Sequence, residues 1–291
     1  MLNHTLRLPR DAAWAAALLT ALAMFAFAAN SLLCRIALQQ GRIDPASFGA
    51  IRLAAGAATL VLVMRLRPRA RAPMAGDWPA AVMLFLYVAC FSFAYLRLAA
   101  GSGALILFGV VQLTMFAAGL RAGERFTGAG WLGLALAVGG LAVLMLPGVA
   151  APSFLGAGLM AVAGAAWGGY SLRGRGVTDP LATTTGNFAR ATPLGLVLWG
   201  VWSARAHLDA HGVALALVSG ALSSGLGYVV WYAALPRLKA LQAATVQLSV
   251  PLIAALGGVL LLDEAFSARL GLAAAAILGG IALVLRAKAR R

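Results

Sequence analysis

The chain has 291 residues, of which 62% are hydrophobic and only 11% are charged, and its formal net charge is +15. Charged residues make up about 25% of an ordinary soluble domain, and a globule of this length needs more polar side chains to cover its surface. The composition therefore places the chain among membrane proteins and excludes the disordered, collagen-like and disulfide-stabilised classes.

Apolar segments long enough to cross a bilayer recur along the whole chain. A transmembrane helix needs about 20 apolar residues, and we interpret the first such segment as a retained anchor, since many others follow it. Ten segments are predicted: 12–34, 45–64, 78–96, 99–120, 127–147, 153–172, 181–202, 208–235, 239–262 and 268–285. Because they leave no room for a soluble domain, the predicted fold is an all-α polytopic membrane protein.

Lysine and arginine are distributed unevenly between the two sides of this predicted bundle. If the N-terminus is cytoplasmic, segments on that side hold 16 of the 23 Lys and Arg residues, and segments on the other side hold 5. Such an excess is typical of cytoplasmic loops. We therefore expect both termini in the cytoplasm, and we attribute the net charge to topology rather than to a nucleic-acid partner.

Four features of the first half recur in the second half at a spacing of 138 or 140 residues. They are Glu124-Arg125-Phe126-Thr127 with Glu264-Ala265-Phe266-Ser267, Gly139-Gly140 with Gly279-Gly280, Arg35 with Arg173, and Arg52 with Arg190. Two halves of five spans each, 1–150 and 151–291, have opposite orientations because five is odd. Inverted repeats are typical of transporters that bind their substrate near the midplane between the halves.

The pattern Glu-x-Phe-[Ser/Thr] followed by Gly-Gly near the end of each half resembles the drug/metabolite transporter superfamily, EamA type, over nearly the whole chain. The arginine in the second span of each half and Pro251 also fit this resemblance, whereas Val111 stands at the first-half position equivalent to Pro251. Within the superfamily the chain is most similar to aromatic amino acid exporters. The resemblance implies a ten-helix exporter of small metabolites whose central cavity is lined by helices 1, 3, 4, 6, 8 and 9.

Ionisable groups other than arginine are confined to span ends and loops. All eight acidic residues and all three histidines lie there, whereas proton-driven transporters usually carry an Asp, Glu or His relay inside the membrane. We therefore expect a facilitator; the alternative is a proton-coupled protein in which Glu124 or Glu264 lies deeper. The spans also lack the residue combinations of an active site, so we predict no enzyme, cofactor or metal site.

Arg52 and Arg190 are the two charges well inside the predicted spans. An arginine in a bilayer is costly and normally has a partner or a function. One interpretation is capture of a substrate carboxylate by the guanidinium; the other, which their symmetric placement favours, is a structural or gating role. Pro193 and Pro251 are expected to interrupt the seventh and ninth spans, and Pro251 is a candidate bending point for gating.

Aromatic residues at helical spacing and polar residues at midspan are the candidate substrate-binding residues. They are Asn30, Tyr87, Phe91, Tyr95, Phe108, Gln112, Trp167, Tyr170, Ser224, Tyr228, Trp231, Thr245 and Ser249. If their helix faces converge, they form an aromatic site with neutral hydrogen-bonding groups, which suits a zwitterion with a flat apolar side chain. The alternative for each is helix packing or interhelical hydrogen bonding.

The predicted function is export of a small aromatic or hydrophobic amino acid by alternating access across a bacterial inner membrane. The bacterial assignment rests on the resemblance and on the Ala-, Arg- and Gly-rich composition. Alternatives are another small solute (a polar amino acid, a purine or a drug-like compound), a channel, or a membrane enzyme. The expected partners are the lipid bilayer and a small-molecule substrate, with the chain acting as a monomer.

Overall fold

A computed structural model of the protein describes residues 10–67, 73–147, 151–238 and 240–289. Within these ranges the regular structure is helical, apart from an isolated bridge between Ile43 and Leu208. The first half contains α1 (Arg10–Gln39), α2 (Pro45–Leu66), α3 (Trp78–Tyr95), α4 (Ala100–Arg121) and α5 (Gly128–Met145). The second half contains α6 (Phe154–Arg173), α7 (Pro180–Trp202), α8 (Ala210–Val218), the π-helix η2 (Ser219–Leu226), α9 (Gly227–Ala234), α10 (Ala240–Val246), α11 (Ser249–Leu262) and α12 (Ala268–Ala289), with 3₁₀ turns η1 (Ser203–Arg205) and η3 (Leu235–Arg237).

Eight helical stretches of the described chain are long and apolar enough to cross a membrane. They are α1 to α5, the stretch from α8 to η3, the stretch from α10 to α11, and α12. The protein is therefore a multi-pass membrane protein. The helices α6 and α7 cover two more of the predicted segments without belonging to this set. Five glycines in α6 and four threonines in α7 lower the hydropathy of these two helices.

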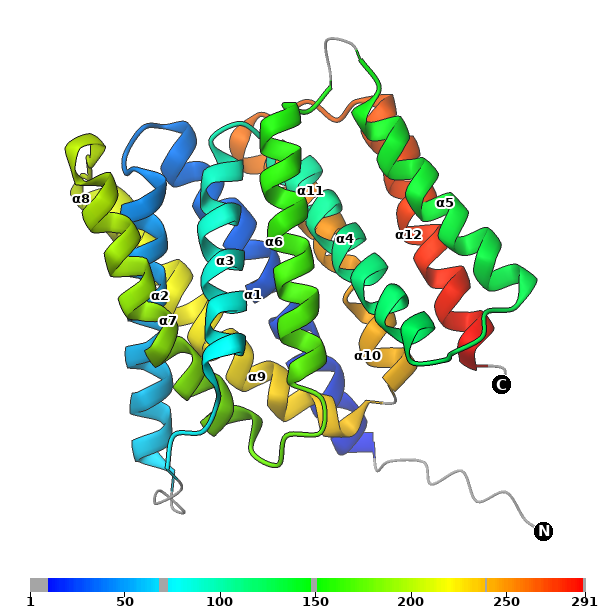
Figure 1. Ribbon diagram of the computed structural model, residues 1–291, viewed down its shortest axis with the longest axis horizontal. Helices are drawn as coiled ribbons and strands as arrows, with labels where there is room; N and C mark the ends of the chain where they lie inside the picture. Colours follow the sequence, from blue (N-terminus) through cyan, green and yellow to red (C-terminus); the bar gives the residue numbers. More distant parts are fainter. Residues whose placement is uncertain (1–9, 68–72, 148–150, 239, 290–291) are drawn as a thin grey trace.

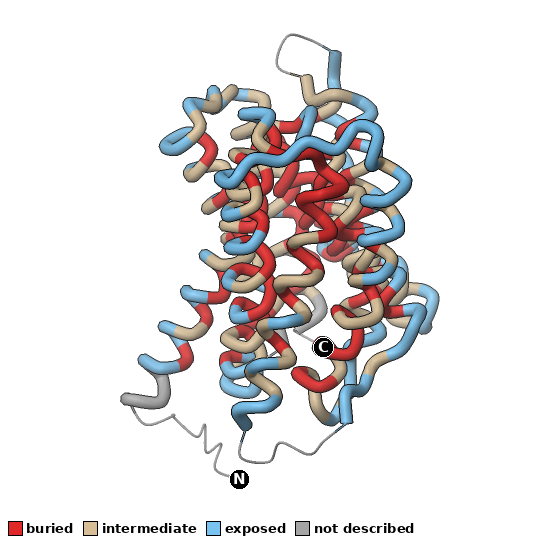
Figure 2. Tube along the Cα trace, turned by 90° about the vertical axis from the view of Figure 1, so that its left-hand side faces the viewer, coloured by how far each residue is buried: buried red, intermediate tan, exposed pale blue. Residues whose placement is uncertain are grey.

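Burial follows the pattern of a bundle placed in lipid. Buried residues line the inside of the bundle and exposed residues follow its outer faces (Figure 2). Many of the exposed side chains are large and apolar, for example Phe25, Leu62, Leu132, Val197 and Leu260. Contact between so much apolar surface and water is unfavourable, so these faces suit the hydrocarbon core of a membrane.

The repeated motif Glu-x-Phe-[Ser/Thr] forms the turn that enters α5 in one half and α12 in the other. The residues before the two glutamates, Gly123 and Asp263, both have positive φ, at 85° and 52°. The hydroxyls of Thr127 and Ser267 then accept hydrogen bonds from the backbone at the start of the next helix. The similarity between the halves thus extends from sequence to local geometry at these two turns.

In each of the two Gly-Gly pairs, the second glycine has a packing role. A Cβ on Gly280 would collide with the carbonyl oxygen of Gly133, and one on Gly140 would lie 2.8 Å from Ile277 Cγ1. A Cβ on Gly139 or on Gly279 would meet no other atom within 4 Å. The glycines at 140 and 280 therefore allow α5 and α12 to pack closely together at one edge of the bundle (Figure 1).

Two predicted segments are less regular than expected. The segment 208–235 contains the π-helix η2, and the segment 239–262 is divided between α10 and α11. Pro251 lies in the first turn of α11, where a missing N–H costs little. The expectation that Pro193 interrupts the seventh span is wrong, since α7 runs through it. The helix therefore tolerates the loss of the one backbone hydrogen bond that this proline cannot donate.

The bundle has two ends, which we name after the acidic residues found there. The Glu264 end carries the connections at 40–44, 96–99, 203–209 and 263–267. The Asp77 end carries the connections at 73–77, 122–127 and 174–179, on the same side as the start of α1 and the end of α12 (Figure 1).

Candidate functional site

A network of polar side chains joins four helices inside the bundle. Asn30 Oδ1 on α1 accepts hydrogen bonds from Ser219 Oγ at 2.8 Å and Ser224 Oγ at 3.4 Å on η2. Arg52 on α2 donates through Nε to Ser224 Oγ at 3.1 Å and through Nη2 to the Tyr87 hydroxyl at 3.0 Å. Three predicted site residues, Asn30, Tyr87 and Ser224, are thus brought together around Arg52.

Close backbone packing makes this network possible. A Cβ on Gly220 would collide with the carbonyl oxygen of Arg52, and one on Gly225 would lie 2.9 Å from the Thr59 side chain. The absence of side chains at these glycines lets η2 lie directly against α2. π-helical turns are frequently found at functional sites, and this one presents Ser219 and Ser224 to Asn30 and Arg52.

Aromatic rings from five helices form a continuous cluster beside this network. Tyr87 contacts Phe91 and Trp167, with ring centroids 5.4 and 4.8 Å apart. Trp167 stacks on Tyr170 at 5.3 Å and contacts Tyr228 at 5.6 Å. The remaining contacts add Tyr95 to Phe91, Phe27 to Tyr228 and Trp231, and Phe188 and Tyr232 to Tyr228. The structure therefore joins the predicted aromatic residues of α3, α6 and α9.

The other predicted residues lie apart from these contacts. Phe108 and Gln112 are buried on α4. Thr245, on α10, is exposed, and Ser249 Oγ donates to the carbonyl of Val246 across the break between α10 and α11.

Arg190 and Arg52 differ in their surroundings although they occupy related positions. The Nη1 atom of Arg190 donates to the carbonyl oxygens of Ala75 at 2.9 Å and Gly186 at 3.0 Å. These bonds attach the connection before α3 to α7. The contacts of Arg190 support its structural interpretation, whereas Arg52 contacts hydroxyl groups and aromatic faces.

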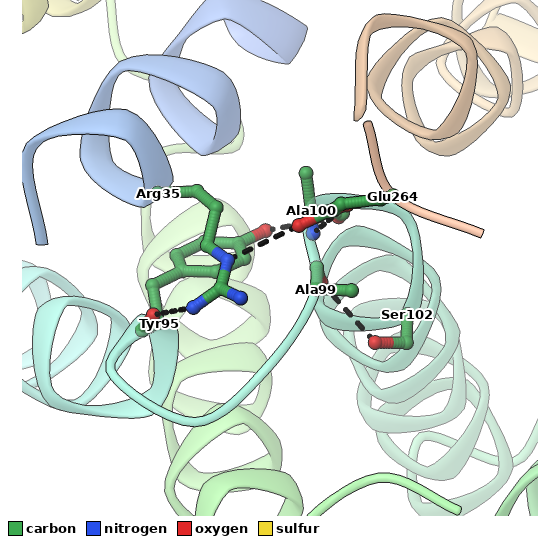
Figure 3. A network of polar contacts seen from close by, with 6 residues as sticks. All are labelled: Arg35, Tyr95, Ala99, Ala100, Ser102 and Glu264. Atoms are coloured by element: carbon green, nitrogen blue, oxygen red, sulfur yellow. Dashed lines mark hydrogen bonds and ion pairs between the residues drawn. The ribbon is translucent and has the colours of Figure 1, made fainter. Parts of the chain in front are cut away.

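A largely shielded ion pair joins two elements at the Glu264 end (Figure 3). Arg35 Nε lies 3.1 Å from Glu264 Oε1, and the two side chains are 16% and 11% exposed. Glu264 Oε2 also accepts the N–H of Ala100 at 2.8 Å, and Arg35 Nη1 donates to the carbonyl of Tyr95 at 3.0 Å. No side chain caps α4 locally, so Glu264 supplies a negative charge at the start of that helix.

The ion pair of the Asp77 end is more exposed. Arg173 Nη2 lies 3.1 Å from Asp77 Oδ2, with the two side chains 44% and 48% exposed. The pKa of Asp77 is lowered by the N–H of Ala80, which the carboxylate accepts, and further by Arg173. Asp77 is therefore ionised at neutral pH and serves both as helix cap and as ion-pair partner.

Residues 154–286, from α6 into α12, match the model of the EamA-like transporter family. An uncharacterized protein of Pseudomonas aeruginosa is 55% identical over 268 residues, which cover 92% of this chain and 93% of that protein. The chain belongs to the EamA-like transporter family. A crystal structure at 19% sequence identity, covering 92% of this chain and 96% of its own, has a TM-score of 0.65 and thus the same fold. Membership in the family assigns the protein to membrane transporters of small solutes rather than to enzymes.

Several residues of the candidate site are not among the candidates from sequence. Phe27 and Phe188 lie in the aromatic cluster, and Ser219 in the polar network. The pair of Arg35 and Glu264 is also new. Each of its members belongs to a repeated feature, and charged residues that recur in both halves are a signal for a contact between the halves.

Proposed function

We propose that the protein exports small amino acids with aromatic or hydrophobic side chains across a bacterial inner membrane, with both termini in the cytoplasm. The observation that carries this proposal is the cluster of aromatic rings beside neutral polar groups inside the bundle. Rings offer stacking surfaces to a flat side chain. Asn30, Ser219 and Ser224 offer hydrogen bonds to the charged ends of a zwitterion without adding charge themselves.

The pattern of helix contacts supports two inverted halves of five spans each. Exchanging the halves replaces α1 by α6, α2 by α7, α3 by the stretch α8–α9, α4 by α10–α11, and α5 by α12. The contacts of α2 with α7, α4 with α11, and α5 with α12 map onto themselves, while that of α3 with α6 maps onto that of α1 with α9. Such a two-fold relation is the basis of alternating access in repeat transporters.

In this mechanism the two halves rock about the site between them. The largely shielded pair of Arg35 and Glu264 closes the Glu264 end, while the Asp77 end is joined by more exposed pairs. Movement that breaks the first pair opens the site toward the Glu264 end. Pro251 lies beside the break between α10 and α11, where a small change in backbone angles reorients α11.

Counterflow in proteoliposomes tests the proposal. Purified protein is reconstituted with unlabelled phenylalanine inside and labelled phenylalanine outside, with no ion gradient imposed. We expect transient accumulation of label, since a facilitator needs only the opposing solute. Trp167→Ala removes a central ring and, at about 1 kcal/mol for a ring contact, weakens the apparent affinity several-fold. Trp131→Ala, which removes a 52% exposed ring on α5, serves as matched control.

The outcomes separate the components of the proposal. Accumulation that requires an imposed proton gradient contradicts the facilitator mechanism and directs attention to Glu264, whose side chain is 11% exposed. No accumulation under either condition contradicts the aromatic substrate. Equal effects of Trp167→Ala and Trp131→Ala contradict the location of the site.

A further inference from the structure

Arg52 is a buried charge without a carboxylate partner. It is 2% exposed, and none of the four ion pairs in the described part of the chain includes it. Its guanidinium carbon lies 5.2 Å from the ring centre of Tyr87 and 5.0 Å from that of Phe91. Nε and Nη2 donate to hydroxyls, whereas Nη1 is buried and has no hydrogen-bond partner among the residues that the structure describes.

This arrangement differs from that of an arginine used only for packing. A guanidinium stays charged under all physiological conditions and carries five N–H donors. A buried donor without an acceptor costs about 1–3 kcal/mol, and more when the group is charged. Arg190 avoids this cost with two backbone carbonyls. In Arg52, two aromatic faces and two hydroxyls only partly compensate the charge.

We propose that Arg52 binds the carboxylate of the transported solute through Nη1. The inference rests on the proposed function and specifies its substrate class: small carboxylates with a flat apolar side chain, amino acids included. A carboxylate is the natural complement of a guanidinium, because its two oxygens accept parallel N–H bonds. The buried positive charge at the same time excludes amines that lack a carboxylate.

The position of Arg52 connects the two parts of the site. Tyr87 bonds to Arg52 and contacts Trp167, and Phe91 contacts both Arg52 and Tyr95. A carboxylate on Nη1 therefore places the rest of the solute next to the aromatic cluster. In the present conformation the guanidinium is covered by protein, and the site becomes accessible when one end of the bundle opens.

Ligand binding to the purified protein tests this role without requiring transport. The probes are two pairs of equal shape and opposite charge: 3-phenylpropionate with 3-phenylpropylamine, and 4-methylpentanoate with 4-methylpentylamine. Apparent affinities are taken from the rise of the thermal unfolding midpoint with ligand concentration. We expect the wild type to be stabilised by 3-phenylpropionate and not by the matching amine.

Variants at the two related arginines form the matched comparison. Arg52→Gln is expected to weaken 3-phenylpropionate binding about 10- to 100-fold, the usual value of a hydrogen bond to a charged group. Arg190→Gln is expected to keep the wild-type affinity and the preference for the carboxylate. If Arg52→Gln does not fold, Arg52→Lys and Arg190→Lys replace the pair, with weaker binding expected only in Arg52→Lys because an ammonium lacks the planar fork.

The possible results separate this proposal from the proposed function. The role of Arg52 is overturned if its variant binds the carboxylates with wild-type affinity. It is also overturned if neither carboxylate stabilises the wild type. Stabilisation by 4-methylpentanoate alone, lost in Arg52→Gln, supports the role of Arg52 and contradicts the aromatic preference. Binding of 3-phenylpropionate that depends on Arg52, without phenylalanine counterflow, supports the site and contradicts phenylalanine export.

Discussion

Arg35 and Arg173 lie at related positions of the two halves, yet they form different contacts at opposite ends of the bundle. Arg35 pairs with Glu264 in a nearly buried setting, with the side chains 16% and 11% exposed. Arg173 pairs with Asp77, and both side chains are almost half exposed. A strict two-fold relation would pair Arg173 with Glu124, the counterpart of Glu264. The sequence repeat therefore determines where the two arginines lie, while the packing of the helices determines which carboxylate each of them contacts.

Burial also makes the two ends energetically unequal. Exposed ion pairs contribute about 0–1 kcal/mol because water and salt screen them. Removing one partner of a buried pair costs more, since the remaining charge stays desolvated. Under the proposed alternating-access mechanism, this asymmetry would correspond to a protein closed at the Glu264 end and ready to open at the Asp77 end. The following predictions test that comparison, beginning with the largest expected effect.

The largest loss of stability is expected for a substitution of Glu264. Glu264→Ala leaves Arg35 without its carboxylate and the Ala100 N–H without its acceptor, with an expected loss of about 3 kcal/mol. Thermal unfolding in detergent micelles measures this loss. In a Cys90→Ala background, maleimide labelling of Cys34, which is fully buried beside Arg35, should also become faster. If Glu264→Ala keeps both the wild-type labelling rate and the wild-type stability, the pair of Arg35 and Glu264 does not close this end.

Two aspartates that cap equivalent helices give a second, smaller contrast. At the Glu264 end, the 1% exposed Asp44 accepts hydrogen bonds from Ala46 N and Ser47 N at the start of α2 and from His207 N.

At the Asp77 end, Asp179 accepts the N–H groups of Leu181 and Ala182 and pairs with Arg67 at the surface. We expect Asp44→Ala to cost about 2 kcal/mol and Asp179→Ala about 1 kcal/mol, because the Asp44 carboxylate is buried and accepts three N–H groups, whereas the Asp179 side chain is 37% exposed and accepts two. The same unfolding assay compares the two variants. Equal losses would remove burial as the reason for the difference between the ends.

The smallest effect is expected for Asp77→Asn, which keeps the helix cap and removes the charge. Because the ion pair is about half exposed, its loss at pH 7 should cost less than about 1 kcal/mol after screening.

The pKa of Asp77 is lowered in the folded protein, so its contribution is fully present above the unfolded value of about 3.9. It is lost as the pH falls through the lower folded value. The difference in unfolding midpoint between wild type and Asp77→Asn should therefore vanish in acid. A difference that grows with acidification contradicts this assignment.

Local sequence was sufficient to predict where the helices lie. Apolar length selects helices in a membrane because hydrocarbon cannot satisfy an open backbone. Aspartate and proline at 44–45 and 179–180 determine where α2 and α7 begin, since the carboxylate caps the helix and proline suits its first position. The repeated Glu-x-Phe-[Ser/Thr] motif likewise encodes a turn and a cap within a few residues. These interactions are short-range and can be read along the chain.

The contacts of the site depend on tertiary structure. Arg35 and Glu264 are separated by 229 positions in the sequence, and Arg52 and Ser224 by 172, so neither contact has a local signal. The π-helix at Ser219–Leu226 and the break between α10 and α11 are two further irregularities that the apolar pattern of the sequence does not indicate. Apolar length and composition alone thus determined the helical membrane fold, because they depend on short stretches of the chain. Which side chains meet, and how far each ion pair is shielded from solvent, is decided by packing between distant helices, because only there do burial and partner choice arise.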